Sequence, residues 1–318
     1  MLKSTRSPLR AAVIGVGYLG AYHAEKYAQL DAVELVAVAD TRVERAQEIA
    51  NRYGVAGHTD YRELLGQIEL ASIVVPTEFH YRVARDCLES GVHILVEKPV
   101  TQTVEQADAL IALAKSKARV FQVGHLERFN PALLALKDQL NSPVFIESHR
   151  LAPFKPRGTD VSVVLDLMIH DIDIILNIVA SPLTDIRATG VPVLTEEIDI
   201  GNARLEFASG CVVNVTASRV TRHPMRKIRV FQPDQYIAID YLERSIALSR
   251  KTQRDGEREE LPQIETTTMK FDQADALALE ISAFVDAALN GTAPPVSGVD
   301  GKRALEVALA ISRDMEKK

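Results

Sequence analysis

This chain of 318 residues has few cysteines, no excess of basic residues and no long apolar run, and each scarcity excludes a class of function. Its two cysteines, Cys87 and Cys211, lie far apart in the sequence, which is typical of buried small residues rather than of a disulfide framework or a metal site. Lysine and arginine number 37 against 43 aspartate and glutamate, so the net charge of −6 provides no electrostatic footprint for nucleic acid or for an anionic membrane.

The chain also lacks the hydrophobic segments that direct a protein into or across a membrane. No apolar run reaches the ~18 residues that span a bilayer. The first residues have no signal-peptide core followed by a small-residue cleavage site. We therefore expect a cytoplasmic protein with no membrane insertion, no nucleic-acid partner and no metal.

What is present is an ordinary globular composition, with 47% hydrophobic and 25% charged residues. At roughly 100–200 residues per domain, the length predicts two domains. The first third alternates short apolar runs, predicted as strands, with amphipathic stretches, predicted as helices. The expected strands are 11–16, 33–40, 70–75, 92–97 and 119–124, and the expected helices are 19–30, 42–53, 80–90 and 103–116. This alternation predicts a doubly wound parallel sheet of the Rossmann type over residues 1–123.

The pattern changes after residue 123, where runs with a period of two residues become common. We predict helices over 131–140, 161–179, 273–289 and 298–316, and strands over 144–151, 200–207, 211–218, 227–232, 236–240 and 245–249. The polar stretch 250–268 is expected to be a surface loop or hairpin. Residues 124–318 are therefore predicted to form an α+β domain for substrate binding and oligomerisation, with a large, mostly antiparallel open sheet.

A glycine-rich string follows the first predicted strand and opens the first predicted helix. It runs Gly15-Val16-Gly17-Tyr18-Leu19-Gly20, the G-x-G-x-x-G spacing of dinucleotide-binding loops. Gly15 would permit the tight turn, Gly17 the close approach of a pyrophosphate, and Gly20 the packing of helix on strand. Tyr18 and Leu19 lie at the helix N-terminus, which favours anions. The alternative is a structural turn that binds no nucleotide.

Asp40 ends the second predicted strand, 20 residues after Gly20. An acidic residue at this place bonds the adenosine ribose hydroxyls and repels a 2′-phosphate, which favours NAD over NADP. Arg42 could neutralise that repulsion and bind the phosphate instead, so NADP remains possible.

Two further features predict chemistry. Lys98 stands at the end of a predicted strand, where ligands bind in open α/β sheets. Asp166, His170 and Asp173 recur at i, i+4 and i+7 in an otherwise apolar helix, so they would share one face. The alternatives are a surface lysine, a hydrogen-bonded core histidine, and a metal site formed by the three helix residues.

Taken together, these residues predict a hydride-transfer site between the two domains. Histidine titrates near neutral pH, so His170 suits the base that removes a hydroxyl proton. Lys98 would supply positive charge to the developing oxyanion or relay the proton. Asp166 would orient the imidazole or hold a substrate hydroxyl.

The order and spacing of these motifs resemble the glucose–fructose oxidoreductase / inositol dehydrogenase family over essentially the whole chain. The resemblance implies that Lys98, Asp166 and His170 are the catalytic residues and that the Lys98–Pro99 bond is cis. It implies homodimers or homotetramers built through the open sheet face. It also places four further residues along the cofactor: Pro76, Thr77, His80 and Glu97.

Two stretches of the second domain bear on the substrate. Residues 124–131 and 149–158 resemble a subgroup of the family that oxidises the 3-hydroxyl of UDP-N-acetylglucosamine, a nucleotide sugar, for the diamino sugar of lipid A. Segment 149–158 carries four cationic side chains, which would suit a diphosphate. Under this interpretation Lys155 and Arg157 lie near the diphosphate, and Arg128 or Asn130 near the sugar, with Asp173 on the substrate side. A solvated basic loop or an inter-subunit contact is the alternative for segment 149–158.

Two other functions fit the same motifs. One is an NAD(P)-dependent dehydrogenase of a free sugar, an inositol or another small cyclic substrate. The other is a non-catalytic regulator that binds the dinucleotide as a sensor, although such a protein would have little reason to keep both Lys98 and His170.

Overall fold

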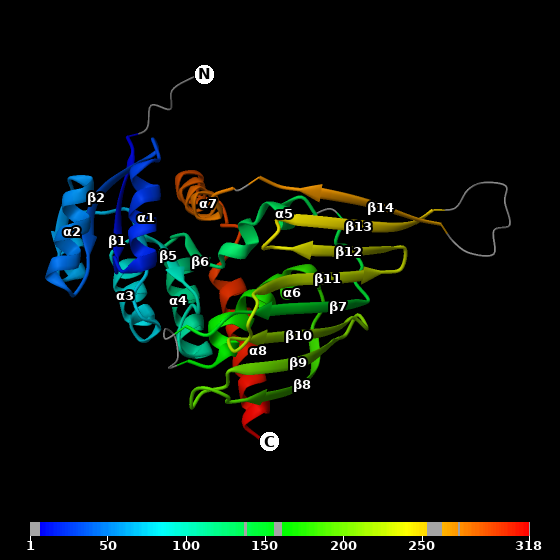
Figure 1. Ribbon diagram of the computed structural model, residues 1–318. Helices are drawn as coiled ribbons and strands as arrows, with labels where there is room; N and C mark the ends of the chain where they lie inside the picture. Colours follow the sequence, from blue (N-terminus) through cyan, green and yellow to red (C-terminus); the bar gives the residue numbers. More distant parts are fainter. Residues whose placement is uncertain (1–6, 137–138, 156–160, 253–262, 273, 318) are drawn as a thin grey trace. The chain divides into compact units, whose positions relative to one another are not determined.

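The computed structural model describes residues 7–136, 139–155, 161–252, 263–272 and 274–317. They form two compact units (Figure 1). The first unit comprises residues 1–126 and 275–305, and the second comprises residues 127–274 and 306–318.

The first unit is built on a parallel sheet of six strands in the order β3-β2-β1-β4-β5-β6. The strands are β1 (Leu9–Ile14), β2 (Val33–Ala39), β3 (Ala56–His58), β4 (Leu70–Ile73), β5 (His93–Glu97) and β6 (Phe121–Gly124). The strand order reverses between β1 and β4, and such a reversal is where open α/β sheets bind dinucleotides. The predicted Rossmann-type sheet is therefore confirmed, with the short strand β3 as an addition.

Helices connect these strands as the sequence predicted, with ends that differ by a few residues. They are α1 (Tyr18–Ala28), α2 (Val43–Tyr53), α3 (Thr77–Glu89) and α4 (Val104–Ser116). A short 3₁₀-helix over Tyr61–Leu64 precedes β4.

Helix α7 (Ala276–Asn290) also belongs to the first unit, although it lies far along the chain. Its buried residues Ile281 and Phe284 share one apolar cluster with Tyr27 of α1 and Leu95 of β5. Helix α8 (Gly298–Glu316) begins in the first unit, where Gly298 packs on Phe121, and ends in the second. The two units thus differ from the predicted domain boundary at residues 123/124, because residues 275–305 pack with the N-terminal part of the chain. A functional division at that boundary, with the cofactor before it and the substrate after it, stays a prediction.

The second unit is built on an eight-stranded sheet in the order β14-β13-β12-β11-β7-β10-β9-β8. Its strands are β7 (Phe145–Leu151), β8 (Leu183–Val191), β9 (Ile200–Phe207), β10 (Val212–Ser218), β11 (Met225–Gln232), β12 (Gln235–Asp240), β13 (Ser245–Thr252) and β14 (Gln263–Lys270). All neighbouring pairs are antiparallel except β7 with β10. The large, mostly antiparallel sheet is confirmed.

The polar stretch 250–268 belongs to a hairpin, one of its two expected forms, since β13 extends to Thr252 and pairs antiparallel with β14, which begins at Gln263. Three other details of the second unit correct the sequence-based expectations. Strand β8 was not predicted. The helix expected over 131–140 is shorter, since α5 covers only Pro131–Leu134. The helix expected over 161–179 begins instead as a π-helix over Val164–Met168 and continues as α6 (Ile169–Ile178).

One face of this sheet is buried under helices of the same unit. A Cβ atom at Gly201 of β9 would lie 2.8 Å from Met315 of α8 and 3.6 Å from Met168 of the π-helix, so these helices pack directly on the strands. The other face carries the aromatic cluster Phe145, Phe231 and Tyr236, whose adjacent ring centroids are 5.6 and 4.9 Å apart. No helix in the described part of the chain has both the length and the apolar character needed to cross a membrane.

Candidate active site

The loop between β1 and α1 leaves no room for a Cβ atom at two of its three glycines. Gly15 has a φ of +86°, and a Cβ atom there would lie 2.4 Å from the carbonyl oxygen of Val74. A Cβ atom at Gly20 would lie 1.9 Å from the carbonyl oxygen of Gly15. At Gly17 the nearest atom to a Cβ would be 3.9 Å away, on Arg42, so this glycine faces open space. The loop thus combines a tight turn with a backbone that a pyrophosphate could approach.

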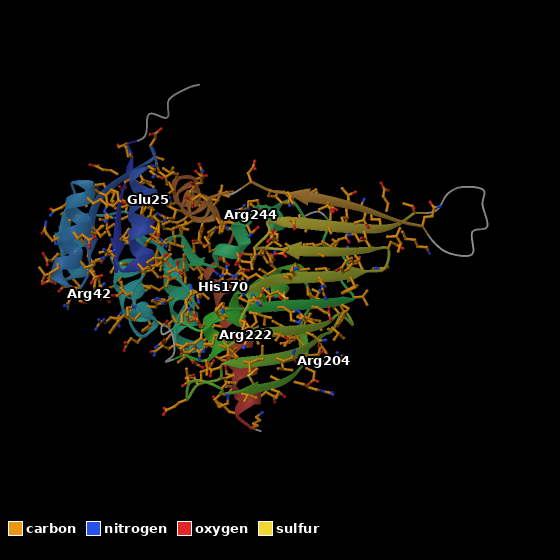
Figure 2. The ribbon with its side chains drawn as sticks, viewed as in Figure 1. Glu25, Arg42, His170, Arg204, Arg222 and Arg244 are labelled. Carbon is orange, nitrogen blue, oxygen red and sulfur yellow. The ribbon has the colours of Figure 1, made fainter. Side chains whose placement is uncertain are left out.

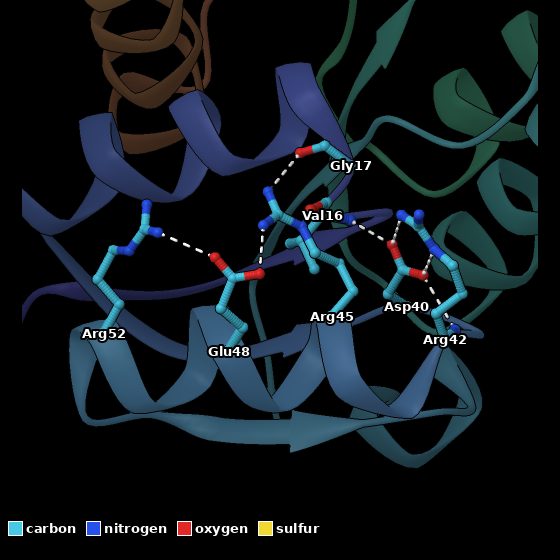
Figure 3. Close-up of polar contacts among 7 residues, drawn as sticks. All are labelled: Val16, Gly17, Asp40, Arg42, Arg45, Glu48 and Arg52. Atoms are coloured by element: carbon cyan, nitrogen blue, oxygen red, sulfur yellow. Dashed lines mark hydrogen bonds and ion pairs between the residues drawn. The ribbon is translucent and has the colours of Figure 1, made fainter.

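Asp40 follows β2 and lies next to this loop (Figure 3). One carboxylate oxygen accepts a hydrogen bond from the Val16 N–H at 3.1 Å, and the other accepts from the Arg42 N–H at 3.0 Å and Nε at 3.2 Å. Burial alone would raise the pKa of Asp40, but the bonds from Arg42 and Val16 outweigh it and lower that pKa. The carboxylate is therefore held ionised where the ribose of a dinucleotide is expected, and Arg42 lies beside it with its side chain 64% exposed.

Arg45 of α2 is a contributor to this loop that the sequence analysis missed (Figure 3). Its guanidinium donates to the carbonyl oxygens of Val16 at 2.6 Å and Gly17 at 3.1 Å. Glu48 accepts from Arg45 at 2.6 Å and from Arg52 at 3.1 Å, so the arginine is itself held in place. In sequence, these three residues have only the spacing of ordinary exposed ion pairs on a helix.

His80 of α3 contacts both the segment that follows β4 and the segment that follows β5. Its imidazole is buried, with Nδ1 2.8 Å from the carbonyl oxygen of Pro99 and Nε2 2.9 Å from that of Val75. Burial lowers the pKa of His80, and the two carbonyl groups partly oppose this effect. Pro76 and Thr77 form the start of α3. A direct contact of Pro76, Thr77 or His80 with the cofactor stays a prediction.

Lys98 directly follows β5, and the Lys98–Pro99 bond is cis, which confirms that expectation. The backbone N–H of Lys98 donates to the Glu97 carboxylate at 3.2 Å. The same carboxylate lies 3.3 Å from Nε2 of His23, a buried residue of α1 that the sequence analysis did not single out. The only signal for His23 is its place three residues after Gly20, on the face of α1 that turns inward.

Asp166 and His170 belong to the second unit, and Figure 2 labels His170. Asp166 lies in the π-helix and His170 in the first turn of α6. A regular α-helix over 161–179 was expected, and the structure instead has a π-helical turn at Asp166; one common face for Asp166, His170 and Asp173 stays a prediction. π-Helical turns occur frequently at functional sites.

Asp173 and Arg128, both predicted to bind substrate, bind each other. Arg128 Nε donates to one Asp173 oxygen at 2.7 Å and Nη2 to the other at 3.1 Å, and Arg128 also contacts Asn177. Asn130 caps α5 by accepting from the Ala132 N–H at 3.1 Å. These predicted substrate residues thus have structural partners within the protein.

A second ion pair corrects the interpretation of segment 149–158. Arg150, counted among its four cations, is buried and donates to Asp171 at 2.6 Å and to Glu127 at 2.9 Å. Burial alone would lower the pKa of Arg150, but the two carboxylates outweigh it and raise that pKa. Lys155 is exposed, and Arg157 lies outside the described residues.

The loop between β10 and β11 adds two basic residues that the sequence analysis missed. Arg222 and His223 are exposed, and the loop is joined to the backbone of segment 149–158 by a bond from the Thr221 N–H to the Ala152 carbonyl at 3.3 Å. Figure 2 shows Arg222 toward the same end of the second unit as His170, whereas Arg204 lies toward the other end. Among the described residues, no carboxylate pairs with Lys155, Arg222 or His223. The described part of the chain also has no cluster of three or more His, Cys, Asp or Glu side chains that could hold a metal ion.

Comparison with known proteins relates these features to a family. Residues 9–125 match the model of the oxidoreductase family with an NAD-binding Rossmann fold, and residues 145–236 match the Gfo/Idh/MocA C-terminal domain. The chain is 38% identical to UDP-N-acetylglucosamine 3-dehydrogenase of Acidithiobacillus ferrooxidans over 95% of this chain and 96% of that protein. It is 28% identical to scyllo-inositol 2-dehydrogenase of Bacillus subtilis over 95% and 92%.

Solved structures agree with these matches. A structure of the Acidithiobacillus ferrooxidans enzyme superposes with a TM-score of 0.92 at 37% identity, covering 98% of this chain and 99% of that one. Levoglucosan dehydrogenase, at 19% identity, has the same fold with a TM-score of 0.86 over 98% of both chains. The glycine-rich loop, the Asp40 carboxylate and the cis Lys98–Pro99 bond thus lie in a chain that belongs to the Gfo/Idh/MocA family of oxidoreductases.

Proposed function

We propose that this protein oxidises the 3-hydroxyl of UDP-N-acetylglucosamine to a 3-keto sugar with NAD as the hydride acceptor. The observation that carries the proposal is the 38% identity to a UDP-N-acetylglucosamine 3-dehydrogenase along nearly the full length of both chains. Similarity to inositol dehydrogenases is lower, at 28% identity for the Bacillus subtilis enzyme. A free sugar or inositol is therefore the second candidate substrate.

The residues of the first unit fit a dinucleotide. When bound, NAD supplies the nicotinamide that takes up the hydride. Gly15 and Gly20 permit the tight turn, Gly17 leaves its backbone open to a pyrophosphate, and the N-terminus of α1 is capped by no side chain. The ionised Asp40 offers acceptors for ribose hydroxyls and repels a 2′-phosphate, which favours NAD over NADP.

The proposed chemistry assigns one task to each catalytic residue. His170 removes the proton of the 3-hydroxyl, because a neutral imidazole is a suitable base near pH 7. Lys98 stabilises the negative charge that develops on the oxygen as the hydride leaves the carbon. Asp166 orients the imidazole or holds a neighbouring hydroxyl.

Substrate binding is proposed for the cationic side chains of the second unit. Lys155 and Arg157 are candidates for the diphosphate, and Arg222 and His223 join them because they are exposed in a loop bonded to the same segment. Arg128, Asn130 and Asp173 are proposed to shape the sugar side, chiefly through the bonds they make within the protein.

The finer consequences of this activity are also proposals. The 3-keto sugar would pass to an aminotransferase that makes the diamino sugar of lipid A, and the enzyme would work in the cytoplasm. A homodimer or homotetramer would form through the open sheet face, where Phe145, Phe231 and Tyr236 present a partly exposed aromatic cluster.

The proposal is tested by absorbance at 340 nm, with NAD or NADP and each candidate substrate added separately. The substrates are UDP-N-acetylglucosamine, its uronic acid, glucose and myo-inositol. We expect reduced cofactor with UDP-N-acetylglucosamine and NAD. A signal with glucose or myo-inositol alone would contradict the nucleotide-sugar proposal and leave the family assignment intact.

A further inference from the structure

A chain of polar contacts, two hydrogen bonds and one ion-pair contact, runs through the core of the first unit and ends at Glu97, the residue before Lys98. The Tyr27 hydroxyl lies 2.9 Å from the Ser72 hydroxyl, which lies 3.1 Å from Nδ1 of His23. Nε2 of His23 lies 3.3 Å from a carboxylate oxygen of Glu97. Tyr27, Ser72 and His23 are fully buried, so water does not compete for these bonds.

The partners fit a single direction of donation along this chain. An ionised carboxylate can only accept, so the 3.3 Å contact with Glu97 is favourable when Nε2 of His23 carries the proton. Nδ1 of a neutral imidazole is then an acceptor, which takes the Ser72 proton, and Ser72 in turn accepts from Tyr27. Protons along this chain thus point toward Glu97, and the last step, from His23 Nε2 to the carboxylate, is a close polar contact at 3.3 Å rather than a well-aligned hydrogen bond.

The Glu97 carboxylate is fixed from two other sides. Its second oxygen accepts from the backbone N–H of Lys98 at 3.2 Å. A Cβ atom at Gly124 of β6 would lie only 2.8 Å from it, so the carboxylate rests against that backbone. A carboxylate held in this way determines where the Lys98 peptide group lies.

We propose that His23 is a positioning residue for catalysis, because it holds the Glu97 carboxylate and thereby the segment that carries Lys98. The proposal rests on the proposed function, since it assumes that Lys98 acts on the substrate. His23 itself is fully buried, so it is proposed to act through Glu97 rather than on the reacting atoms. Its loss affects the rate through the misplacement of Lys98, and displacements on the order of 1 Å can cost about 100-fold in rate.

The charges around Glu97 determine how the pH profile responds. Burial alone would raise the pKa of Glu97, but His23 and Lys98 outweigh it and lower that pKa. His80 is the other titratable group that the Glu97 charge acts on. Without His23, Lys98 would remain as the main group that counters the effect of burial on the pKa of Glu97. Glu97 should then take up a proton at a higher pH than in the wild-type protein.

The test compares His23→Leu with His23→Gln. Leucine fills much of the space but donates nothing, whereas the glutamine amide retains a donor near the position of Nε2. We expect His23→Leu to lower kcat on UDP-N-acetylglucosamine by about 10- to 100-fold, with little change in KM for NAD, and to move the acidic limb of the kcat/KM profile to higher pH. His23→Gln should restore most of the rate. The control is His58→Leu, which removes a partly exposed histidine–glutamate pair of the same unit and should leave kcat unchanged.

A second readout needs no substrate. The Lys98 amide is protected by its bond to Glu97, and Pro99 has no amide hydrogen, so exchange in a peptide spanning 97–99 reports on that bond. We expect exchange there to quicken by about tenfold or more in His23→Leu and to return toward the wild-type rate in His23→Gln. Gly124→Ala, which pushes on the same carboxylate from β6, should have the same effect as His23→Leu.

The outcomes separate this inference from the proposed function. Wild-type exchange and wild-type kcat in both His23→Leu and Gly124→Ala would overturn the positioning role. Equal losses in His23→Leu and His23→Gln would also overturn it, since the donor would then be irrelevant. Suppose that the wild-type protein fails to oxidise UDP-N-acetylglucosamine while His23→Leu still quickens exchange at Lys98. In that case the proposed substrate is wrong, and the positioning of Lys98 by His23 and Glu97 is supported.

Discussion

At the scale of single residues, Lys98 and His170 carry the proposed chemistry. Replacing Lys98 by Met or His170 by Ala should lower kcat by about 100- to 10,000-fold, the range that a general acid or base contributes. Cofactor binding should persist, because neither change alters the glycine-rich loop. Fluorescence titration with NADH measures that binding, and the chain has no tryptophan to interfere. Turnover that survives both changes would contradict the mechanism.

Cofactor choice is also determined by individual side chains. Asp40→Ser removes the carboxylate that repels a 2′-phosphate and releases Arg42 from its ion pair. We expect the ratio of kcat/KM for NADP to that for NAD to rise by about tenfold or more, since the electrostatic term at such a distance is on the order of 1–4 kcal/mol. Asp60→Ser is the matched control, because Asp60 pairs with Arg62 at the same spacing. An equal rise in the control would contradict this explanation.

Arg45 should affect cofactor affinity without touching the substrate. Arg45→Met removes the donors to the carbonyl groups of Val16 and Gly17, so the loop loses its support. We expect the Kd for NADH to rise by about tenfold, the effect of losing roughly 1.4 kcal/mol of binding free energy, while KM for the sugar stays unchanged. Arg52→Met, which removes only the outer partner of Glu48, should have a much smaller effect.

The sequence predicted those site residues whose role depends on local spacing. The glycine string and Asp40 are recognisable because a turn, a helix N-terminus and a strand end lie close together in the chain. Arg45 and His23 were not, because each acts on a partner 28 to 74 residues away. Arg128 and Asp173, 45 residues apart, were both identified as polar site residues, but their pairing follows from the tertiary fold.

At the scale of secondary structure, two arginine–carboxylate pairs hold α6 within the three residues that follow His170. Arg150 binds Asp171, and Arg128 binds Asp173. Arg150→Met would leave Asp171 and Glu127 without their main partner. We expect a loss of about 3–5 kcal/mol in the free energy of unfolding, typical of a broken buried pair, measured by denaturant titration. Arg187→Met, which breaks an exposed pair, should cost less than about 1 kcal/mol.

The same pair gives a pH dependence of defined sign. Burial alone would raise the pKa of Glu127, but Arg150 outweighs it and the pKa is lowered from 4.5. The stabilisation is therefore complete above about pH 4.5 and is lost as the pH falls through the lowered pKa. In thermal melts, the difference in Tm between wild type and Arg150→Met should be largest near neutral pH and shrink in acid. A difference that stays constant from pH 7 to pH 3 would contradict this account.

Some elements could not be predicted because their residues lack a local pattern. Strand β14 is exposed along nearly its whole length, so it shows no alternation of apolar and polar residues. Strand β8, at the other edge of the sheet, has a single buried residue, Ala188, so its apolar pattern is weak as well. The parallel pairing of β7 with β10 joins strands that are some 65 residues apart, which no periodicity indicates.

At the scale of the whole chain, the first unit depends on residues from its distant C-terminal part. Phe284 of α7 is fully buried against the N-terminal core. Phe284→Ala should lower the stability of this unit by about 3–5 kcal/mol, through lost burial and the cavity left behind. Saturating NADH should recover part of the loss if the unit that unfolds is the one that binds the cofactor. Val299→Ala, at a half-exposed position of α8, is the control.

The return of α7 to the first unit also affects how the protein is made. The ribosome delivers the six parallel strands early, but the helix that covers Tyr27 and Leu95 emerges only after the entire second sheet. During most of synthesis the nascent first unit therefore exposes an apolar surface, the state in which chains aggregate or recruit chaperones. Translation that pauses between residues 126 and 275 would prolong that exposure.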